Sequence, residues 1–280
     1  MSLLSRLARS ALGRAFFRIH YGISRNSATA QILRHSFLEE LRREPRYRDR
    51  KRLSAFEHKA FSQNGEDGII REIFRRIGNG GKTFVEIGVG DGLENNTTLL
   101  LHEGWRGLWI EGDAKNCRAI ATHFARPLET GQIVLRNTIV TRDNVVGLVA
   151  DGAPPGEVDL LSIDVDRNTY YIWQALGNLK PRVVVVEYNS VFPADMAWVV
   201  DYADKSWNGT THYGASLKAY ELLGERLGYR LVGCDITGTN AFFVRADLCA
   251  DLFCDPFTSE NHYEPDRHSF NQTKRRAFSD

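Results

Sequence analysis

The stretch Thr83-Phe-Val-Glu-Ile-Gly-Val-Gly-Asp-Gly92 decides the fold of this chain. An apolar run that contains Glu86 ends in three glycines at alternate positions, Gly88, Gly90 and Gly92. Glycine has no Cβ and tolerates positive φ, so a strand that ends in such a turn brings bare backbone close to a ligand. The pattern predicts a buried strand followed by a tight, ligand-binding turn.

A second apolar run, Gly107-Leu-Trp-Ile-Glu111, follows about twenty residues later and also ends in an acid. In a βαβ unit, an acid at the tip of the second strand can accept hydrogen bonds from a ribose. Glu111 is therefore the candidate ribose ligand. The two runs together predict a nucleoside-binding α/β domain, and the alternative is a structural strand-turn-helix without a cofactor.

The spacing of the glycines distinguishes between classes of nucleoside. Dinucleotide sites use G-x-G-x-x-G, with a helix N-terminus facing the pyrophosphate. This chain has G-x-G-x-G, with Glu86 two residues before the first glycine. An acid there would repel a pyrophosphate but suits the ammonium group of S-adenosylmethionine, which has no phosphate. The turn resembles motif I of the class I S-adenosylmethionine-dependent methyltransferases, and a dehydrogenase is disfavoured.

From Lys82 onward, short apolar runs alternate with amphipathic segments, a pattern that predicts a mainly parallel sheet covered on both faces. Strands are expected near 83–88, 107–111, 132–136, 158–163, 182–187, 230–234 and 240–245. Helices are expected near 68–77, 96–103, 114–124, 142–150, 168–177 and 214–227. Only a few residues around Gly238 join the last two strands, which predicts an antiparallel hairpin. The expected fold class is α/β, with a Rossmann-like seven-stranded sheet that ends in this hairpin.

The chain divides by charge into a basic arm and an acidic body. Residues 1–53 contain thirteen basic and four acidic residues and so have a formal charge of +9. Because the whole chain has a net charge of +1, the remaining residues have a net charge of −8. Apolar residues recur at helical spacing over 3–19, and a second helix is expected over 28–43. We expect a basic helical extension at 1–53, a methyltransferase-like domain at 54–255 and a polar tail at 256–280.

The basic helix of the extension could lie on a membrane surface, on its own domain or on a partner subunit of a homo-oligomer. The small total charge suggests no bulk attraction to nucleic acid. The four cysteines lack metal-site spacing and are expected to be free thiols in a reducing compartment. The sequence shows neither a secretory signal nor a transmembrane run, so a cytoplasmic location is expected, with contact to the membrane periphery as an option.

Hard oxygen ligands follow two strands that should be neighbours. Asp164 and Asp166 follow the expected fourth strand, and Glu187 and Asn189 follow the fifth. Oxygen ligands that converge at one edge of a sheet suit Mg²⁺, Mn²⁺ or Ca²⁺. The candidate metal ligands are Asp164, Glu187 and Asn189. The alternative is that these acids orient a cofactor and cap helices, as Asp166 could do for the following helix.

His212 is the candidate general base, because its polar, glycine-rich flanks are unlike a core strand and its ordinary pKa lies near neutrality. The alternative is a histidine that stabilises its loop. The polar segment Phe61–Gly68 precedes an amphipathic helix and could cover the methionine end of a cofactor with Gln63 and Asn64. It could equally be a helix-capping loop, with Asp67 in the first turn.

The pattern from Phe61 to about Leu248 resembles the FkbM-like methyltransferases over about two-thirds of the chain. The motifs that support the resemblance are FSQNGEDGII, FVEIGVGDG, LWIEGD, LLSIDVD, VVVEYNSVFP, THYGAS and CDITGTNAFFV. The resemblance implies a Rossmann-like fold and O-methylation, often of sugars or related natural products. By match to motif I it implies that Glu86, Gly88, Gly90 and Glu111 hold the cofactor, and that Asp164 lies beside cofactor and acceptor. Relatives commonly have glycine where this chain has Arg167, so the acceptor-binding details of the family are not assigned to this chain.

The sequence therefore indicates an S-adenosylmethionine-dependent O-methyltransferase that acts on a hydroxyl of a sugar, glycan or related natural product. Catalysis would come mostly from alignment of the two reactants, with His212 or a metal-bound carboxylate site that includes Asp164 removing the proton. The rival from another class is a non-catalytic protein that retained the fold and binds a glycan or a partner.

Overall fold

The computed structural model describes residues 36–204 and 212–267, and the expected helix over 3–19 lies outside them. One compact unit spans Asp49–Arg267. Of the other unit, residues 36–42 are helical and Pro45–Arg48 forms the 3-10 helix η1. The compact unit thus begins a few residues before the boundary expected after residue 53. No helix of the described residues is long and apolar enough to cross a membrane.

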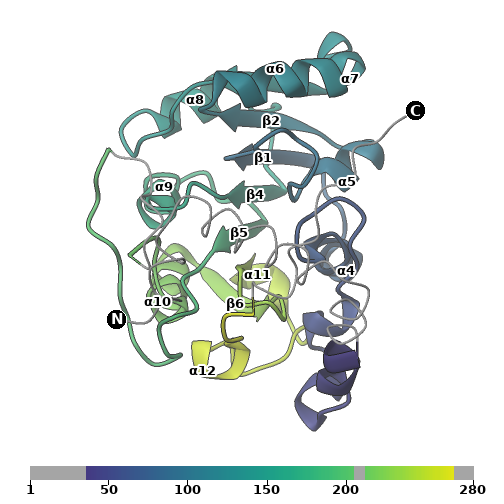
Figure 1. The fold of residues 1–280 in the computed structure, drawn as a ribbon, viewed down its shortest axis with the longest axis vertical. Helices are drawn as coiled ribbons and strands as arrows, with labels where there is room; N and C mark the ends of the chain where they lie inside the picture. The colour runs from purple at the N-terminus through teal and green to yellow at the C-terminus, as the bar shows by residue number, and fades with distance from the viewer. Residues whose placement is uncertain (1–35, 205–211, 268–280) are drawn as a thin grey trace, which may run out of the picture. The chain divides into compact units, whose positions relative to one another are not determined.

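Seven strands form one sheet in the order β3-β2-β1-β4-β5-β7-β6 (Figure 1). Strands β1 to β5 are parallel, β7 pairs antiparallel with β5, and β6 pairs antiparallel with β7. Their bounds are β1 Thr83–Ile87, β2 Arg106–Glu111, β3 Ile133–Asn137, β4 Leu160–Ile163, β5 Val183–Glu187, β6 Tyr229–Cys234 and β7 Asn240–Arg245. The predicted seven-stranded sheet with a terminal hairpin is confirmed, with each strand within two residues of its expected start.

Helices cover both faces of the sheet, as the alternating pattern predicted. One face packs against α8 (Val145–Gly152), α9 (Thr169–Ala175) and α10 (Leu217–Leu227). The other packs against α4 (Glu66–Ile77), α5 (Thr98–His102) and α6 (Ala114–His123). Figure 1 shows α9 and α10 on one side of the sheet and α4 and α5 on the other. The short elements η2 (Leu53–Phe56), α7 (Ala125–Glu129), α11 (Ala246–Cys249) and α12 (Ser259–His262) were not expected from the sequence.

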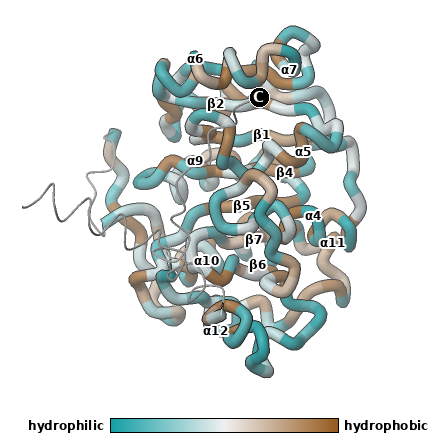
Figure 2. Tube along the Cα trace, turned by 45° about the vertical axis from the view of Figure 1, so that its right-hand side comes forward, coloured by the Kyte–Doolittle hydropathy of each residue, from teal (hydrophilic) through white to brown (hydrophobic). Residues whose placement is uncertain are grey.

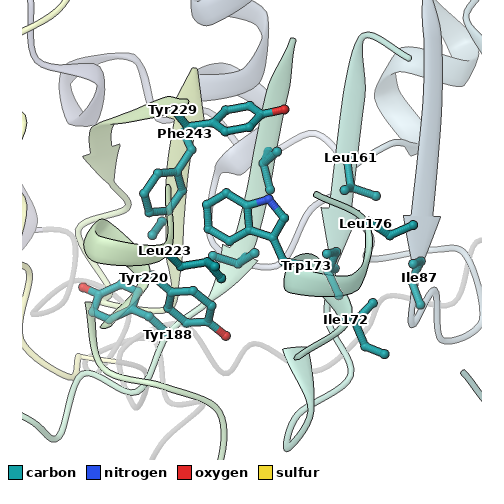
Figure 3. Packing of buried hydrophobic residues seen from close by; sticks show 14 of the residues in the cluster. Ile87, Leu161, Ile172, Trp173, Leu176, Tyr188, Tyr220, Leu223, Tyr229 and Phe243 are labelled. Atoms are coloured by element: carbon teal, nitrogen blue, oxygen red, sulfur yellow. The ribbon is translucent and has the colours of Figure 1, made fainter. Parts of the chain in front are cut away.

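The central strands are buried on both faces, so their side chains alternate between two cores. In β5, Val184 and Val186 pack on one side and Val183 and Val185 on the other. Figure 2 shows hydrophobic residues concentrated in these strands, and Figure 3 shows aromatic side chains packed around Trp173 in one core. Burial of this apolar surface is the main stabilising contribution to the fold.

Residues 256–267, which the sequence analysis assigned to a polar tail, belong to the compact unit. The Tyr188 hydroxyl, at the end of β5, donates to the Glu264 carbonyl at 2.7 Å. The Tyr263 hydroxyl donates to the Ser190 carbonyl at 2.6 Å, and the Arg267 guanidinium donates to a carbonyl of the β6–β7 turn. These hydrogen bonds satisfy polar groups that the apolar pattern of the strands does not reveal.

Asp235 begins the β6–β7 turn and is fully buried. Its Oδ1 accepts the backbone N–H groups of Thr239 and Asn240, and Thr237 donates its hydroxyl to Oδ2. Burial raises the pKa of Asp235 to about 7, and the nearby Glu66 carboxylate adds to this rise. An asparagine would keep the Oδ1 acceptor and remove the buried charge.

We therefore expect Asp235→Asn to stabilise the protein at alkaline pH. The folded-state pKa of Asp235 is raised, so ionisation progressively costs the wild type stability as pH rises from about 4 to about 7. Urea unfolding should give a gain of about 1–3 kcal/mol at pH 8 that disappears near pH 4. The exposed-acid variant Asp195→Asn is the charge control. A variant that is less stable than wild type at pH 8 would contradict the expectation.

Candidate functional site

A pocket of about 600 Å³ opens at the carboxyl ends of the parallel strands. It lies where the order of the sheet reverses between β1 and β4, the usual ligand position in open α/β sheets. Its volume is within the range of small-molecule sites. Its lining includes Gly88, Gly90, Glu111, Ile139, Asp164 and Asp166.

The glycines after β1 have separate roles. Gly88 has φ +84°, and its N–H donates to the Ile110 carbonyl at 2.9 Å. A Cβ on Gly88 would lie 1.7 Å from the Asp164 carbonyl oxygen, so only glycine lets β1 and β4 approach here. Gly90 has φ +63°, and a Cβ there would meet nothing within 4 Å. Gly90 therefore presents bare backbone to the pocket, whereas Gly92 packs on Phe124 and does not line it.

Glu111 closes the other side of the turn. Its Oε2 accepts the Gly90 N–H at 2.8 Å, and its Oε1 accepts the Asp113 N–H at 2.8 Å. The residue is only 8% exposed but lines the pocket. Oε1 also accepts the Asn116 side-chain amide at 3.4 Å, so Oε2 is the oxygen that retains a lone pair for a ligand hydroxyl. The structure thus places the Glu111 carboxylate at the pocket, where Oε2 can accept one further hydrogen bond.

Glu86 lies away from the pocket, within β1. It accepts the backbone N–H groups of Asn96 and Thr97, the Asn95 amide and the Thr97 hydroxyl. Burial raises the pKa of Glu86, while these donors oppose the rise. Glu86 therefore fixes the segment before α5, and its assignment to a cofactor ammonium stays a prediction that its contacts do not favour.

The Phe61–Gly68 segment forms a capping loop. The Asp67 carboxylate accepts the N–H groups of residues 60, 61 and 62 at 2.7–2.8 Å. Asn64 donates to the buried Glu66 carboxylate, while Gln63 is exposed. Neither Gln63 nor Asn64 lines the pocket. Their assignment to the cofactor stays a prediction.

Three carboxylates meet beside the glycine turn. One ligand oxygen each from Asp164, Asp166 and Glu187 lies within 4.8 Å of the others. The Asp164 and Asp166 side chains are exposed to the pocket, although the surrounding protein displaces much of their bulk water. This loss of hydration, followed by the charge of Asp166 and then of Glu86, raises the pKa of Asp164 to about 7. Burial followed by the charge of Asp164 raises the pKa of Glu187 well above its ordinary value.

Two other predicted site residues, Asn189 and His212, do not line the pocket. The Asn189 side chain is buried, donates to the Tyr213 carbonyl at 3.0 Å and accepts the Val191 N–H, so its amide orders the loop after β5. His212 is exposed, and its ring lies edge-on to Trp198 with centroids 6.1 Å apart. Asp166 joins Asp164 and Glu187 in the carboxylate cluster, and the assignment of Asn189 as a metal ligand stays a prediction.

The pocket has one sign of charge. Five carboxylates and no lysine, arginine or histidine stand among the described residues that line it. The apolar wall includes Ile139, which is 74% exposed although large and hydrophobic. Ile139 was not predicted from the sequence. The available signal was its apolar side chain two residues after β3, where a polar loop begins. An acidic pocket with an apolar wall suits a cationic ligand that has a flat, uncharged ring.

The chain matches no protein-family model and no curated protein. Among solved structures, it is similar to the METTL16 MTase domain, with 13% identity, 64% of this chain and 66% of that chain covered, and a TM-score of 0.40. It is also similar to magnesium protoporphyrin IX methyltransferase from Synechocystis PCC 6803 with bound SAH (11% identity, 64% and 85% covered, TM-score 0.40). A third similar structure is a protein from Staphylococcus aureus assigned as a caffeoyl-CoA O-methyltransferase (13% identity, 82% of this chain and 97% of that chain covered, TM-score 0.46). The match spans just under two thirds of the METTL16 domain, and no residue role is carried over from these structures.

Proposed function

We propose that the protein is an S-adenosylmethionine-dependent O-methyltransferase. The observation that supports this best is the charge of the pocket: five carboxylates and no basic residue among the described lining residues. A dinucleotide would bring a pyrophosphate into this field and be repelled. S-adenosylmethionine brings a nucleoside without phosphate and a net positive charge.

The lining residues fit the parts of that cofactor. The space beside Gly90 that a Cβ would fill is open to the adenosyl group. Glu111 Oε2 has a lone pair for a ribose hydroxyl, and the exposed Ile139 offers an apolar surface to the purine. Asp164, one residue beyond β4, would face the charged end of the ligand.

When bound, the cofactor supplies an electrophilic methyl group on a sulfonium. The residues of this chain would hold the ligand, exclude water and accept a proton. Asp164 is placed for the proton, because its carboxylate faces the pocket and its raised pKa is near neutrality. His212 remains the second candidate, since its loop follows β5 on the same side of the sheet as Asn189.

The acceptor is proposed to be a hydroxyl of a sugar, glycan or related natural product, as the family resemblance implies. The segment after β5 supports this with a partly exposed stacked pair, Phe192 and Trp198, whose ring centroids are 4.3 Å apart. A flat aromatic surface is a suitable platform for a sugar ring. Calorimetric titration with S-adenosylhomocysteine, and with NAD as the control ligand, tests the proposal, because binding of neither would favour the non-catalytic alternative.

Glu111→Ala should weaken S-adenosylhomocysteine binding by about 1–3 kcal/mol, the range for losing hydrogen bonds to a charged group. Glu111→Gln is the matched variant, because it keeps one acceptor for the Gly90 or Asp113 N–H. It should bind with intermediate affinity if the ribose contact matters and the turn remains folded. Unchanged affinity in the alanine variant would remove Glu111 from the site.

A further inference from the structure

We propose that Asp164, Asp166 and Glu187 form a divalent cation site at the edge of the pocket. The site deepens the proposed function, since its use in methyl transfer rests on that function, but binding of the cation does not. The proposed ligand set differs from the one expected from sequence, because Asp166 replaces Asn189.

The first observation is the separation of the carboxylates. Their ligand oxygens lie within 4.8 Å of one another. Divalent cations bind oxygen at roughly 2.0–2.6 Å, so two oxygens on opposite sides of one ion are about 4–5 Å apart. The three side chains therefore need little movement to share a cation. The exposure of Asp164 and Asp166 to the pocket leaves room for water or an acceptor oxygen to complete the coordination.

The second observation is independent of this spacing. Glu187 Oε2 is buried and has no hydrogen-bond partner. A buried carboxylate oxygen without a donor is costly, and such atoms are rare in folded proteins. Glu187 is the last residue of β5, so the sheet holds this side chain toward the two aspartates after β4. A bound cation would satisfy the oxygen and offset the repulsion among the three charges.

No positive group is among the strongest electrostatic influences on Asp164 or Glu187. The charged residues with the largest effect on Asp164 are all acids: Asp166, Glu86, Glu66 and Glu111. The same is true of Glu187, on which Asp164, Asp166 and Asp235 act. The all-oxygen donor set favours Mg²⁺, Mn²⁺ or Ca²⁺ over softer metals. A cation here would lower the pKa of a coordinated acceptor hydroxyl.

The test is Mn²⁺ binding to the full chain, measured by electron paramagnetic resonance of free Mn²⁺ after removal of metals with EDTA. Wild type should bind one Mn²⁺, with Mg²⁺ in competition. Glu187→Gln and Asp166→Asn should each weaken binding by about tenfold or more, because fewer charged ligands remain. Asp195→Asn, an exposed acid eight residues beyond Glu187, is the charge control and should bind like wild type.

Thermal unfolding distinguishes a role of Glu187 as a metal ligand from a purely structural role. In metal-free buffer, Glu187→Gln should not lower Tm, because the Oε2 atom that it replaces is buried and makes no hydrogen bond. Mn²⁺ should raise the Tm of the wild type but not that of the variant. If wild type binds no Mn²⁺, or if Glu187→Gln binds it equally well, the site is wrong. S-adenosylhomocysteine titrations of the same samples test the proposed function separately. If the protein binds S-adenosylhomocysteine but does not bind Mn²⁺, only the metal site is overturned. If it binds Mn²⁺ but does not bind S-adenosylhomocysteine, only the proposed cofactor is overturned.

Discussion

Gly88→Ala should abolish cofactor binding. The new Cβ would lie 1.7 Å from the Asp164 carbonyl oxygen, so β1 and the segment after β4 must separate. The residue would also have to keep φ +84°, a conformation that costs an alanine about 1–2 kcal/mol. Both effects act on the turn that presents Gly90 and on Asp164. We expect S-adenosylhomocysteine affinity to fall by about 100-fold or more, which corresponds to roughly 3 kcal/mol.

Gly104→Ala is the matched control for backbone strain. Gly104 has φ +82°, nearly the same as Gly88, but a Cβ there would meet nothing within 4 Å. This variant should lose a little stability in urea unfolding and bind the ligand like wild type. If Gly88→Ala binds as tightly as Gly104→Ala, the close approach of the two strand ends has no part in forming the site.

The second large effect is expected at Asp164. Asp164→Asn keeps the size of the side chain but removes both a proton acceptor and a charged ligand of the proposed cation, so turnover should fall by about 10²–10⁴-fold. Affinity for S-adenosylhomocysteine should stay within a few-fold of wild type, because the turn and Glu111 are unchanged. Single-turnover kinetics with a methylatable acceptor, alongside calorimetry, distinguishes loss of chemistry from loss of binding.

His212→Ala provides the comparison, because sequence reasoning assigned the same proton to His212. His212 is exposed, lies against Trp198 and does not line the pocket, so we expect its replacement to cost less than about tenfold in turnover. A loss at His212 that matches the loss at Asp164 would mean that the loop after β5 moves onto the pocket during the reaction. Full activity in Asp164→Asn would exclude Asp164 as the base.

The sheet could be predicted because its strands are buried on both faces. Runs such as Val183–Glu187 are continuously apolar and end in an acid where the strand meets water, so their bounds are readable without any partner. Elements of four or five residues, such as α7 and α12, contain too few turns to show a helical period. The role of residues 256–267 depended on hydroxyl groups of Tyr188 and Tyr263, whose partners are distant in sequence.

The pocket lining could be predicted from the sequence only where a single strand end determines it. Gly88, Gly90 and Glu111, which line the pocket, each stand at a fixed distance from an apolar run. The contacts of Glu86 could not be predicted, because its side chain points to a segment ten residues later that returns to the strand only in the folded chain. The place of Asp166 in the carboxylate cluster could not be predicted either, because it depends on the backbone conformation after β4. Asp166 adopts φ +53°, which no local pattern indicates.

The single sign of charge in the pocket also bears on the end of a catalytic cycle. If the ligand is S-adenosylmethionine, its positive charge leaves with the methyl group, and the product S-adenosylhomocysteine is neutral overall. The five carboxylates would then attract the substrate form more strongly than the spent form. The acidic lining that selects the ligand would thereby favour exchange of product for fresh substrate, and this preference should weaken as salt screens the charges.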